Sequence, residues 1–308
     1  MVTFIARRFL YSILILFGVI TVTFSLMYVI PGDPARLMLG QRADVASIEA
    51  VRKQLGLDDP IYIQYVRFIG KALQGDLGRS YSSNRDVLKT ILETFPATAL
   101  LAFSALFVSS LIGIIIGVIS AVKPYTWKDN LSMLIALFGI SFPPFALGLI
   151  MALVFGAWLK WFPISGYINN GMQYLFLPMF TLALRPMSII ARLTRSSMLD
   201  TLSMDFVRTA KAKGVSNWKV IIIHALRNAL NPVVTTISAW LAALLGGAFF
   251  IEYIFNWPGI GLLAINSILS LDFPMIQGTV LFTAVIFIIV NIIVDIIYAF
   301  LDPKVKLS

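Results

Sequence analysis

The sequence predicts an all-α membrane protein with six transmembrane helices. Three observations carry the prediction: the composition, six long apolar runs, and the uneven placement of Lys and Arg. Of the 308 residues, 59% are hydrophobic and 13% are charged, and the mean hydropathy is +0.89. Soluble proteins are about half apolar and a quarter charged. A water-soluble fold has no means of covering so much apolar surface, so much of the chain must lie in lipid.

Six apolar runs are long enough to cross a hydrocarbon core of ~30 Å, which takes about 20 residues. They cover approximately residues 9–30, 96–121, 131–155, 174–191, 229–251 and 275–301. The fourth run is interrupted by Pro178, Arg185 and Pro186. The first follows Arg7 and Arg8 as a signal peptide would, but its length and the lack of a small-x-small cleavage site predict a retained helix.

The basic residues indicate that both termini are cytoplasmic, because short cytoplasmic loops retain Lys and Arg. With the N-terminus inside, the short outer loops carry only Lys160, and residues 252–274 carry no basic residue. The inner segments hold Arg7, Arg8, Lys123, Lys128, Arg192, Arg195, Arg208, Lys211, Lys213, Lys219, Arg227, Lys304 and Lys306. The long outer loop holds nine basic and eight acidic residues, but loops of that length cross largely regardless of charge.

Five segments follow from this topology. Residues 1–30 form the cytoplasmic N-terminus and first helix, and residues 31–95 form the extracytoplasmic loop. Residues 96–191 hold the second to fourth helices, and residues 192–228 form a cytoplasmic loop. Residues 229–308 hold the last two helices and the cytoplasmic C-terminus.

The extracytoplasmic loop is predicted to form a small helical domain. Asp59-Pro60 is an N-cap followed by proline at a first helical position, and apolar residues then recur at helical spacing. A second helix is expected over residues 47–55, stopped by Gly56, and a third over about residues 85–94. Two interpretations stay open: a cap packed on the outer helix ends, or a docking surface for a partner outside the membrane.

Several classes of chemistry are poorly supported. The chain has no cysteine, which excludes disulfides and thiolate sites, and its single histidine, His224, offers little for zinc binding or a catalytic triad. The net charge of +9 follows membrane sidedness rather than a basic surface for nucleic acid. The only Gly-Lys pair, Gly70-Lys71, has Tyr65 where a phosphate-binding loop needs glycine. We expect no catalytic, cofactor-binding or metal-binding residue, so that energy comes from a partner or a gradient.

The cytoplasmic loop predicts two short helices joined by a turn. Ser203 is expected to cap the first helix, with Asp205 at its start, Lys211 and Lys213 at its end, and Gly214 as a left-handed stop. The second helix is expected to start at a Ser216 cap and to run through Trp218 and the apolar residues 220–223.

One side of the first of these helices carries Phe206, Thr209 and Ala210. Small and apolar residues on one side suit insertion into a groove on another protein. An amphipathic helix lying on lipid headgroups would also explain the bases and Trp218. The residues alone leave both interpretations open.

The same loop resembles the EAA loop of ABC-importer permeases, in the form found in the oligopeptide and dipeptide permease family. RTAKAKG at residues 208–214 is similar to that family's RTARAKG, and HALRNA at 224–229 with Pro232 is similar to its HALRNA-x-x-P. Arg208 stands where the broader pattern has glutamate, and Thr209 where it has alanine, which points to the peptide branch. Further matches are PGDP at 31–34, GDLG at 75–78, TRSSM at 194–198, NWPG at 256–259 and LDP at 301–303.

The resemblance implies the B-type transmembrane subunit of a peptide, nickel or glutathione importer, with the type I ABC importer permease fold in a bacterial cytoplasmic membrane. It implies a homologous second permease, two cytoplasmic ATPases that bind ATP and Mg, and an extracytoplasmic solute-binding protein. Substrate then crosses by alternating access. The ATPase-coupling residues that it implies are Asp205, Phe206, Arg208, Thr209, Ala210, Lys211, Ala212, Lys213 and Gly214. The resemblance leaves the cargo open among dipeptides, oligopeptides, glutathione and nickel complexes.

Three residues are candidates for the pathway. If the fourth run is helical, Arg185 lies about 10 Å deeper than Arg192. It can snorkel, pair with a carboxylate, or meet an anionic substrate group. Pro143 and Pro144, with Gly139 and Gly148 nearby, predict either a hinge or a static kink.

Two further features are expected to be structural. Gly246, Gly247 and Ala248 in the fifth run are expected to permit close helix packing. Asp295 follows Asn291 by four residues on the last helix and is expected to bond to a neighbouring helix near the cytoplasmic side.

Two other functions compete with an ABC permease. An ion-coupled secondary transporter needs titratable groups near the midplane and usually an inverted repeat, and the sequence shows neither clearly. An intramembrane enzyme needs paired acids, a cysteine or a suitably placed histidine, and the sequence offers none of these.

Overall fold

The computed structural model describes residues 2–29, 33–39 and 44–301. Within them the regular structure is helical, apart from an isolated antiparallel bridge between Arg79 and Asp86, which confirms the predicted all-α class. The chain divides into one compact unit of residues 1–98 and 258–308 and another of residues 99–257. Four described helices are long and apolar enough to cross a membrane, and a bent helix pair makes a fifth if it counts as one crossing. The predicted count of six remains a prediction.

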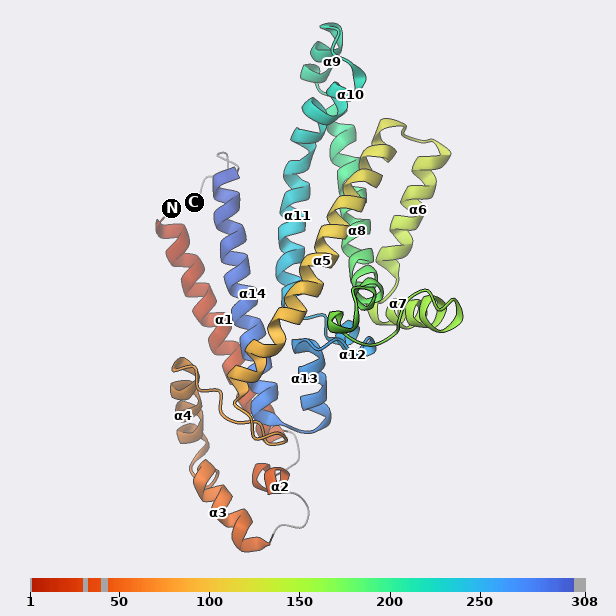
Figure 1. The fold of residues 1–308 in the computed structure, drawn as a ribbon. Coiled ribbons are helices and arrows are strands. Elements are labelled where there is room, and N and C mark those ends of the chain that lie inside the picture. The colour runs from red at the N-terminus through yellow and green to blue at the C-terminus, as the bar shows by residue number, and fades with distance from the viewer. Residues whose placement is uncertain (1, 30–32, 40–43, 302–308) are drawn as a thin grey trace. The chain divides into compact units, whose positions relative to one another are not determined.

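The first unit is built on two antiparallel helices, α1 (Val2–Val29) and α14 (Phe273–Leu301), which lie side by side in Figure 1. At one end Arg8 pairs with Asp295 at 3.1 Å, and toward the other Gln277 donates a hydrogen bond to the carbonyl oxygen of Thr23. The expected bond from Asp295 to a neighbouring helix is therefore confirmed. Helix α13 (Ile260–Leu269) packs on α14. It lies within residues 252–274, which were predicted to be an outer loop.

Three short helices fill the long connection after α1: α2 (Pro34–Leu39), α3 (Val45–Leu55) and α4 (Ile61–Leu73). Gly56 closes α3 with φ +66°, as predicted. Pro60, rather than Asp59, occupies the cap position of α4, and no side chain caps that helix.

Helix α5 (Val87–Val122) starts about nine residues before the predicted second span, which began at residue 96. The separate helix predicted over residues 85–94 is therefore the first part of α5. The Asp86 carboxylate accepts a hydrogen bond from the Lys89 backbone N–H at 2.8 Å and so caps the helix start. Pro96 lies inside the helix. A membrane helix tolerates an internal proline where neighbouring groups satisfy the freed backbone, so Pro96 was a poor marker of a boundary.

The second unit packs the rest of α5 with α6 (Trp127–Ser141), α8 (Gln173–Leu202) and α11 (Arg227–Leu245). Two glycines bring α5 against α8. A Cβ atom at Gly117 would lie 2.5 Å from the Cβ of Thr194, and one at Gly113 would lie 2.8 Å from the carbonyl oxygen of Met187. Small residues thus allow close helix approach here.

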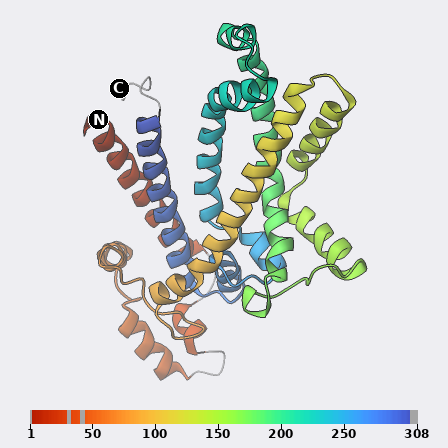
Figure 2. The same cartoon turned by 45° about the horizontal axis from the view of Figure 1, so that its top comes forward.

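The third predicted span is not one straight helix. Helix α6 ends at Ser141, and α7 (Pro144–Met151) continues after a bend of 107° into a π-helix, η1 (Ala152–Trp158), as the yellow-green ribbon of Figure 2 shows. Two consecutive prolines, Pro143 and Pro144, explain the break, because neither supplies a backbone N–H to continue the helical ladder.

The fifth predicted span also ends earlier than expected. Helix α11 stops at Leu245, Gly246 follows as its cap, and Gly247 has φ +112°. A separate short helix, α12 (Phe249–Ile254), comes next. The expectation that Gly246, Gly247 and Ala248 pack inside a helix was therefore wrong, because the backbone breaks at these residues.

Candidate coupling loop and pathway face

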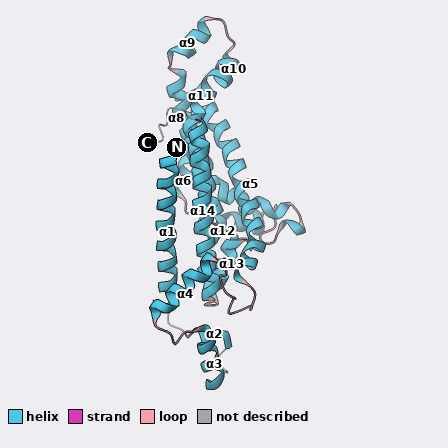
Figure 3. Cartoon of the chain, turned by 90° about the vertical axis from the view of Figure 1, so that its left-hand side faces the viewer, coloured by secondary structure: helices cyan, strands magenta, loops and turns pink. Residues whose placement is uncertain are grey.

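A helical hairpin follows α8 and is the candidate coupling loop, defined as residues 203–219. Helix α9 (Asp205–Ala212) and the short helix α10 (Asn217–Lys219) face each other across a turn at one end of α8 and α11 (Figure 3). Gly214 has φ +78° and stops α9, as predicted. Asp205 lies in the first turn and Lys211 in the last, where the helix dipole favours their charges.

Two predicted caps differ from the structure. The Ser203 hydroxyl donates to the carbonyl oxygen of Asp200 at 2.7 Å, so it closes α8. Met204 takes the cap position of α9 and makes no side-chain cap bond. Ser216 does precede α10 but also makes no cap bond, and α10 runs directly through a π-helix, η3 (Val220–Leu226), into α11.

A cluster of apolar side chains packs the hairpin of α9 and α10 against the neighbouring ends of α8 and η3. Val207, Ala210 and Val220 are 0%, 8% and 0% exposed and pack together, with Leu202 and Val215 beside them. Ala210 therefore faces inward. The expectation that it shares one outward side with Phe206 and Thr209 was wrong, because the i, i+3 spacing of Val207 and Ala210 sets the buried side of the helix.

The outward side of α9 mixes charge with apolar surface. Asp205 and Arg208 form an exposed pair at 3.4 Å, and Phe206 is 40% exposed. The other exposed residues between positions 204 and 214 are Met204, Thr209, Lys211, Ala212, Lys213 and Gly214. An apolar anchor surrounded by polar side chains is typical of an interaction surface.

The HALRNA stretch connects the hairpin to three helices. Ala225 and Ala229 are 0% and 2% exposed and pack with Ala121 of α5 and Met198 of α8. A displacement of α9 would therefore reach η3, α8 and α11 through packed side chains rather than through a flexible tether.

Arg195 of the TRSSM stretch forms an ion pair with the buried Asp129 of α6. The Arg195 guanidinium donates to both carboxylate oxygens of Asp129, at 2.6 and 2.7 Å, and the Tyr125 backbone N–H donates to Asp129 at 2.8 Å. Asp129 is 1% exposed. Thr194 lies against Gly117, and Met198 is fully buried. In this chain the stretch joins α8 to α5 and α6.

Arg185 is exposed on α8. It lies near the centre of the helix and has no ion-pair partner among the residues that the structure describes. On a helical wheel it shares its side with Arg192 and Ser196, which are also exposed. A carboxylate partner for Arg185 would therefore have to come from outside the described chain.

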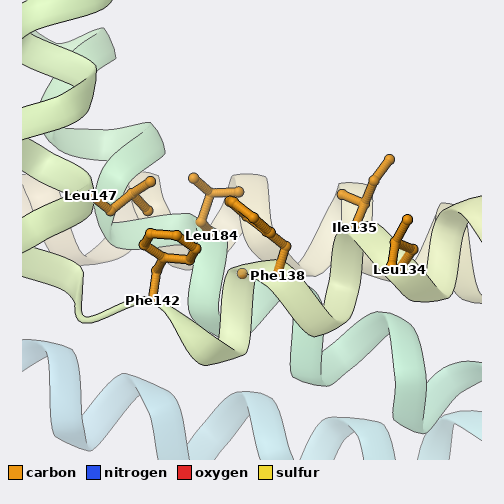
Figure 4. Close-up of a pocket in the computed structure, with 7 residues that line it drawn as sticks. Leu134, Ile135, Phe138, Phe142, Leu147 and Leu184 are labelled. Carbon is orange, nitrogen blue, oxygen red and sulfur yellow. The ribbon is translucent and has the colours of Figure 1, made fainter.

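A half-open apolar pocket of about 220 Å³ lies at the bend between α6 and α7 (Figure 4). Phe138 and Phe142 contact each other with ring centroids 4.3 Å apart. The other lining residues are Leu134, Ile135, Gly139, Leu147 and Leu184. This lining offers no polar group to a solute, so the two prolines shape α6 and α7 rather than a polar binding site.

Helix α11 has a polar side that was not predicted from the sequence. Asn228, Asn231, Thr235, Ala239 and Ala243 are all exposed, and their spacing of three or four residues places them on one side of the helix. Two asparagines three residues apart in an apolar run were the available signal. In a membrane helix such a side is expected to face a protein partner or a water-filled path rather than lipid.

Comparison with known proteins decides the family. A model described as "Binding-protein-dependent transport system inner membrane component" matches residues 113–307, and its N-terminal counterpart matches residues 1–102. This chain belongs to that family. It is therefore a membrane permease subunit that forms part of the translocation pathway of an ABC importer, and an ion-coupled secondary transporter is not favoured.

Relatives of this permease match over nearly its whole length. The glutathione transport system permease protein GsiC is 42% identical in Escherichia coli K12 and in Salmonella paratyphi A, over 99% of both chains in each case. The crystal structure of an amino acid ABC transporter superposes with a TM-score of 0.53 at 11% identity, covering 68% of this permease and 94% of that chain. The structural match supports the fold alone.

Proposed function

We propose that this permease imports peptides or peptide-like solutes, glutathione among them, in an ATP-driven complex with a second permease, two ATPases that bind ATP and Mg, and a solute-binding protein. The observation that carries the proposal is the full-length similarity to glutathione permeases. In this proposal the chain crosses the membrane six times, both termini lie in the cytoplasm of a bacterial cell, and this chain itself performs no catalysis.

The candidate coupling loop, residues 203–219, receives the motion of an ATPase. Phe206 supplies the exposed apolar anchor, and Asp205, Arg208, Thr209, Lys211, Ala212, Lys213 and Gly214 surround it, while Ala210 holds α9 to the protein core. Because α10 continues through η3 into α11, movement of the hairpin tilts α11. Rigid-body tilting of this kind opens the pathway alternately to each side.

The pathway side of this permease consists of the polar side of α11 and the exposed cation Arg185. The free carboxylates of a peptide-like solute are anionic, and an unpaired guanidinium at membrane depth attracts them strongly because the low dielectric weakens screening. Pro143 and Pro144 contribute by fixing the bend beside Leu184, next to Arg185.

Reconstitution of the complex tests the proposal. The permease, co-purified with its subunits, is placed in liposomes with labelled glutathione and a labelled dipeptide as probes. We expect uptake of at least one probe with ATP on the ATPase side, and none with a proton gradient alone. Gradient-driven uptake by the permease without an ATPase subunit would contradict it.

A further inference from the structure

We propose that the first unit carries a binding site for an anionic phospholipid of the outer leaflet, between α1, α4 and the start of α14, in the orientation proposed above. The argument rests on the depth of α4, its apolar outer side, and a basic pocket behind it.

Helix α4 lies at the level of the apolar part of α1. The Tyr65 hydroxyl and the Thr21 hydroxyl are 2.6 Å apart, and the Tyr65 ring contacts Phe17 and Phe24 at 6.5 and 5.1 Å. All three α1 residues fall in the apolar stretch Leu10–Ser25. Figure 3 shows α4 crossing beside α1. With α1 crossing the membrane, as in the proposed topology, α4 lies where lipid is the solvent, not above the membrane.

The side of α4 that faces away from α1 is apolar. Tyr62, Val66 and Leu73 are 69%, 66% and 80% exposed, and their spacing places them on one side of the helix. A helix with such a side and a basic opposite side lies in the interface with its apolar side in lipid. This combination explains why α4 exposes large apolar residues beside a membrane-spanning helix.

The opposite side of α4 borders a pocket of about 590 Å³. Phe24, Met27 and Phe68 line its apolar part, and Arg67, Lys71 and Arg79 line its basic part. Other lining residues are Leu57, Gln64, Asp76, Leu77, Gly78, Tyr81, Asn84, Pro274 and Gln277. The volume is in the range of small-molecule sites, large enough for a headgroup and the first part of the acyl chains.

The charges of the pocket are incompletely balanced within the chain. Arg67 pairs with Asp59, but neither Lys71 nor Arg79 has an ion-pair partner among the described residues. Asp76 is the one carboxylate of the lining, and it accepts a hydrogen bond from the Gly78 backbone N–H. Unpaired cations at membrane depth are costly unless an anion reaches them. A phosphate beside Lys71 and Arg79, with its acyl chains along Phe24 and Phe68, satisfies both parts of the pocket.

Native mass spectrometry of the purified permease, with its co-purifying subunits, measures lipid binding directly. Phosphatidylglycerol and phosphatidylcholine of equal chain length are the probes. We expect phosphatidylglycerol to bind more tightly, and Lys71→Gln with Arg79→Gln to weaken it by roughly 30-fold, or about 2 kcal/mol at low ionic strength. The matched control is Lys53→Gln with Lys89→Gln, which removes the same charge from exposed residues outside the pocket and should leave binding unchanged.

Three outcomes would overturn the proposal: equal binding of the two lipids, equal loss in both double variants, or displacement of phosphatidylglycerol by inorganic phosphate at a similar concentration, which would indicate a soluble-anion site. A photoactivatable phosphatidylglycerol gives a test on the unmodified protein, independent of whether a variant folds. Cross-links within residues 17–28, 57–84 or 274–277 support the site, and cross-links confined to other surfaces contradict it.

Discussion

At the scale of single residues, the most consequential contact is the buried pair between Asp129 and Arg195. Replacing Asp129 by Asn removes one charge and leaves Arg195 without its partner. Breaking a buried pair in this way costs about 3–5 kcal/mol, and the lower end applies here because the Arg195 side chain is 20% exposed. We expect a marked drop in the unfolding temperature of the detergent-purified permease. The exposed pair Asp205 and Arg208 provides the contrast, because Asp205→Asn should hardly change that temperature. Equal effects of the two variants would refute the structural role of Asp129.

Arg185 makes the second prediction at this scale. If it meets an anionic group of the solute, Arg185→Ala should weaken solute affinity by tenfold or more, since a charge-assisted bond contributes roughly 1.5–3 kcal/mol. Arg185→Lys should recover part of that affinity because it keeps the charge. The measurement is ATP-driven uptake across a range of solute concentrations. An unchanged uptake curve for Arg185→Ala would remove this residue from the pathway.

At the scale of elements, local chemistry predicted some boundaries and missed others. Gly56 and Gly214 stop their helices as expected, because a left-handed residue at a helix end is a local property. The start of α5 and the end of α11 were misplaced, since proline and glycine inside apolar runs act differently according to their neighbours. The contact of Asp129 with Arg195 joins residues 66 positions apart, and no local pattern reveals such a partner.

Helix contact between α5 and α8 gives a prediction about packing. At Gly117, valine would bring new atoms against Thr194 and Ala191, which are within 2.6 Å of a Cβ atom placed there. Overpacking of this kind costs about 1–3 kcal/mol or more. Gly18 of α1 is the matched control, because a Cβ atom at Gly18 meets nothing within 4 Å. Thermal unfolding of Gly117→Val and Gly18→Val should therefore differ, with a loss of stability only in the first variant.

The hairpin of α9 and α10 gives the functional prediction for an element. Phe206→Asp should abolish ATP-driven uptake while leaving the unfolding temperature nearly unchanged, because Phe206 is exposed and lies outside the Val207 cluster. A bulky residue at Ala210 should lower both uptake and stability, since Ala210 is packed inside. Trp127→Ala, at the first residue of α6, is a control at another exposed aromatic residue, which is 70% exposed against 40% for Phe206. Full uptake in Phe206→Asp would count against the coupling loop.

At the scale of the whole molecule, composition was enough to predict a helical membrane protein, and motif order was enough to predict its family. The candidate site was predicted less completely. The residues of the coupling loop were identified, but which of them face outward depended on the packing of Val207, Ala210 and Val220. The polar side of α11 lies almost entirely within the predicted fifth run, but its exposure depends on which helices pack against α11, and no local pattern reveals that packing.

Whether the bent pair of α6 and α7 crosses the membrane determines the topology of every later segment. The sequence has no cysteine, so single introduced cysteines can test this topology. If the bent pair crosses the membrane, Lys160 lies outside with Lys53, and the coupling loop lies inside. If it is re-entrant, Lys160 lies inside, and every later segment, including Ser216, is inverted. We expect a membrane-impermeant maleimide to label Lys53→Cys and Lys160→Cys in right-side-out vesicles, and Ser216→Cys only after permeabilisation. Labelling of Ser216→Cys from outside would contradict both the six-span topology and the contact of α9 with a cytoplasmic ATPase.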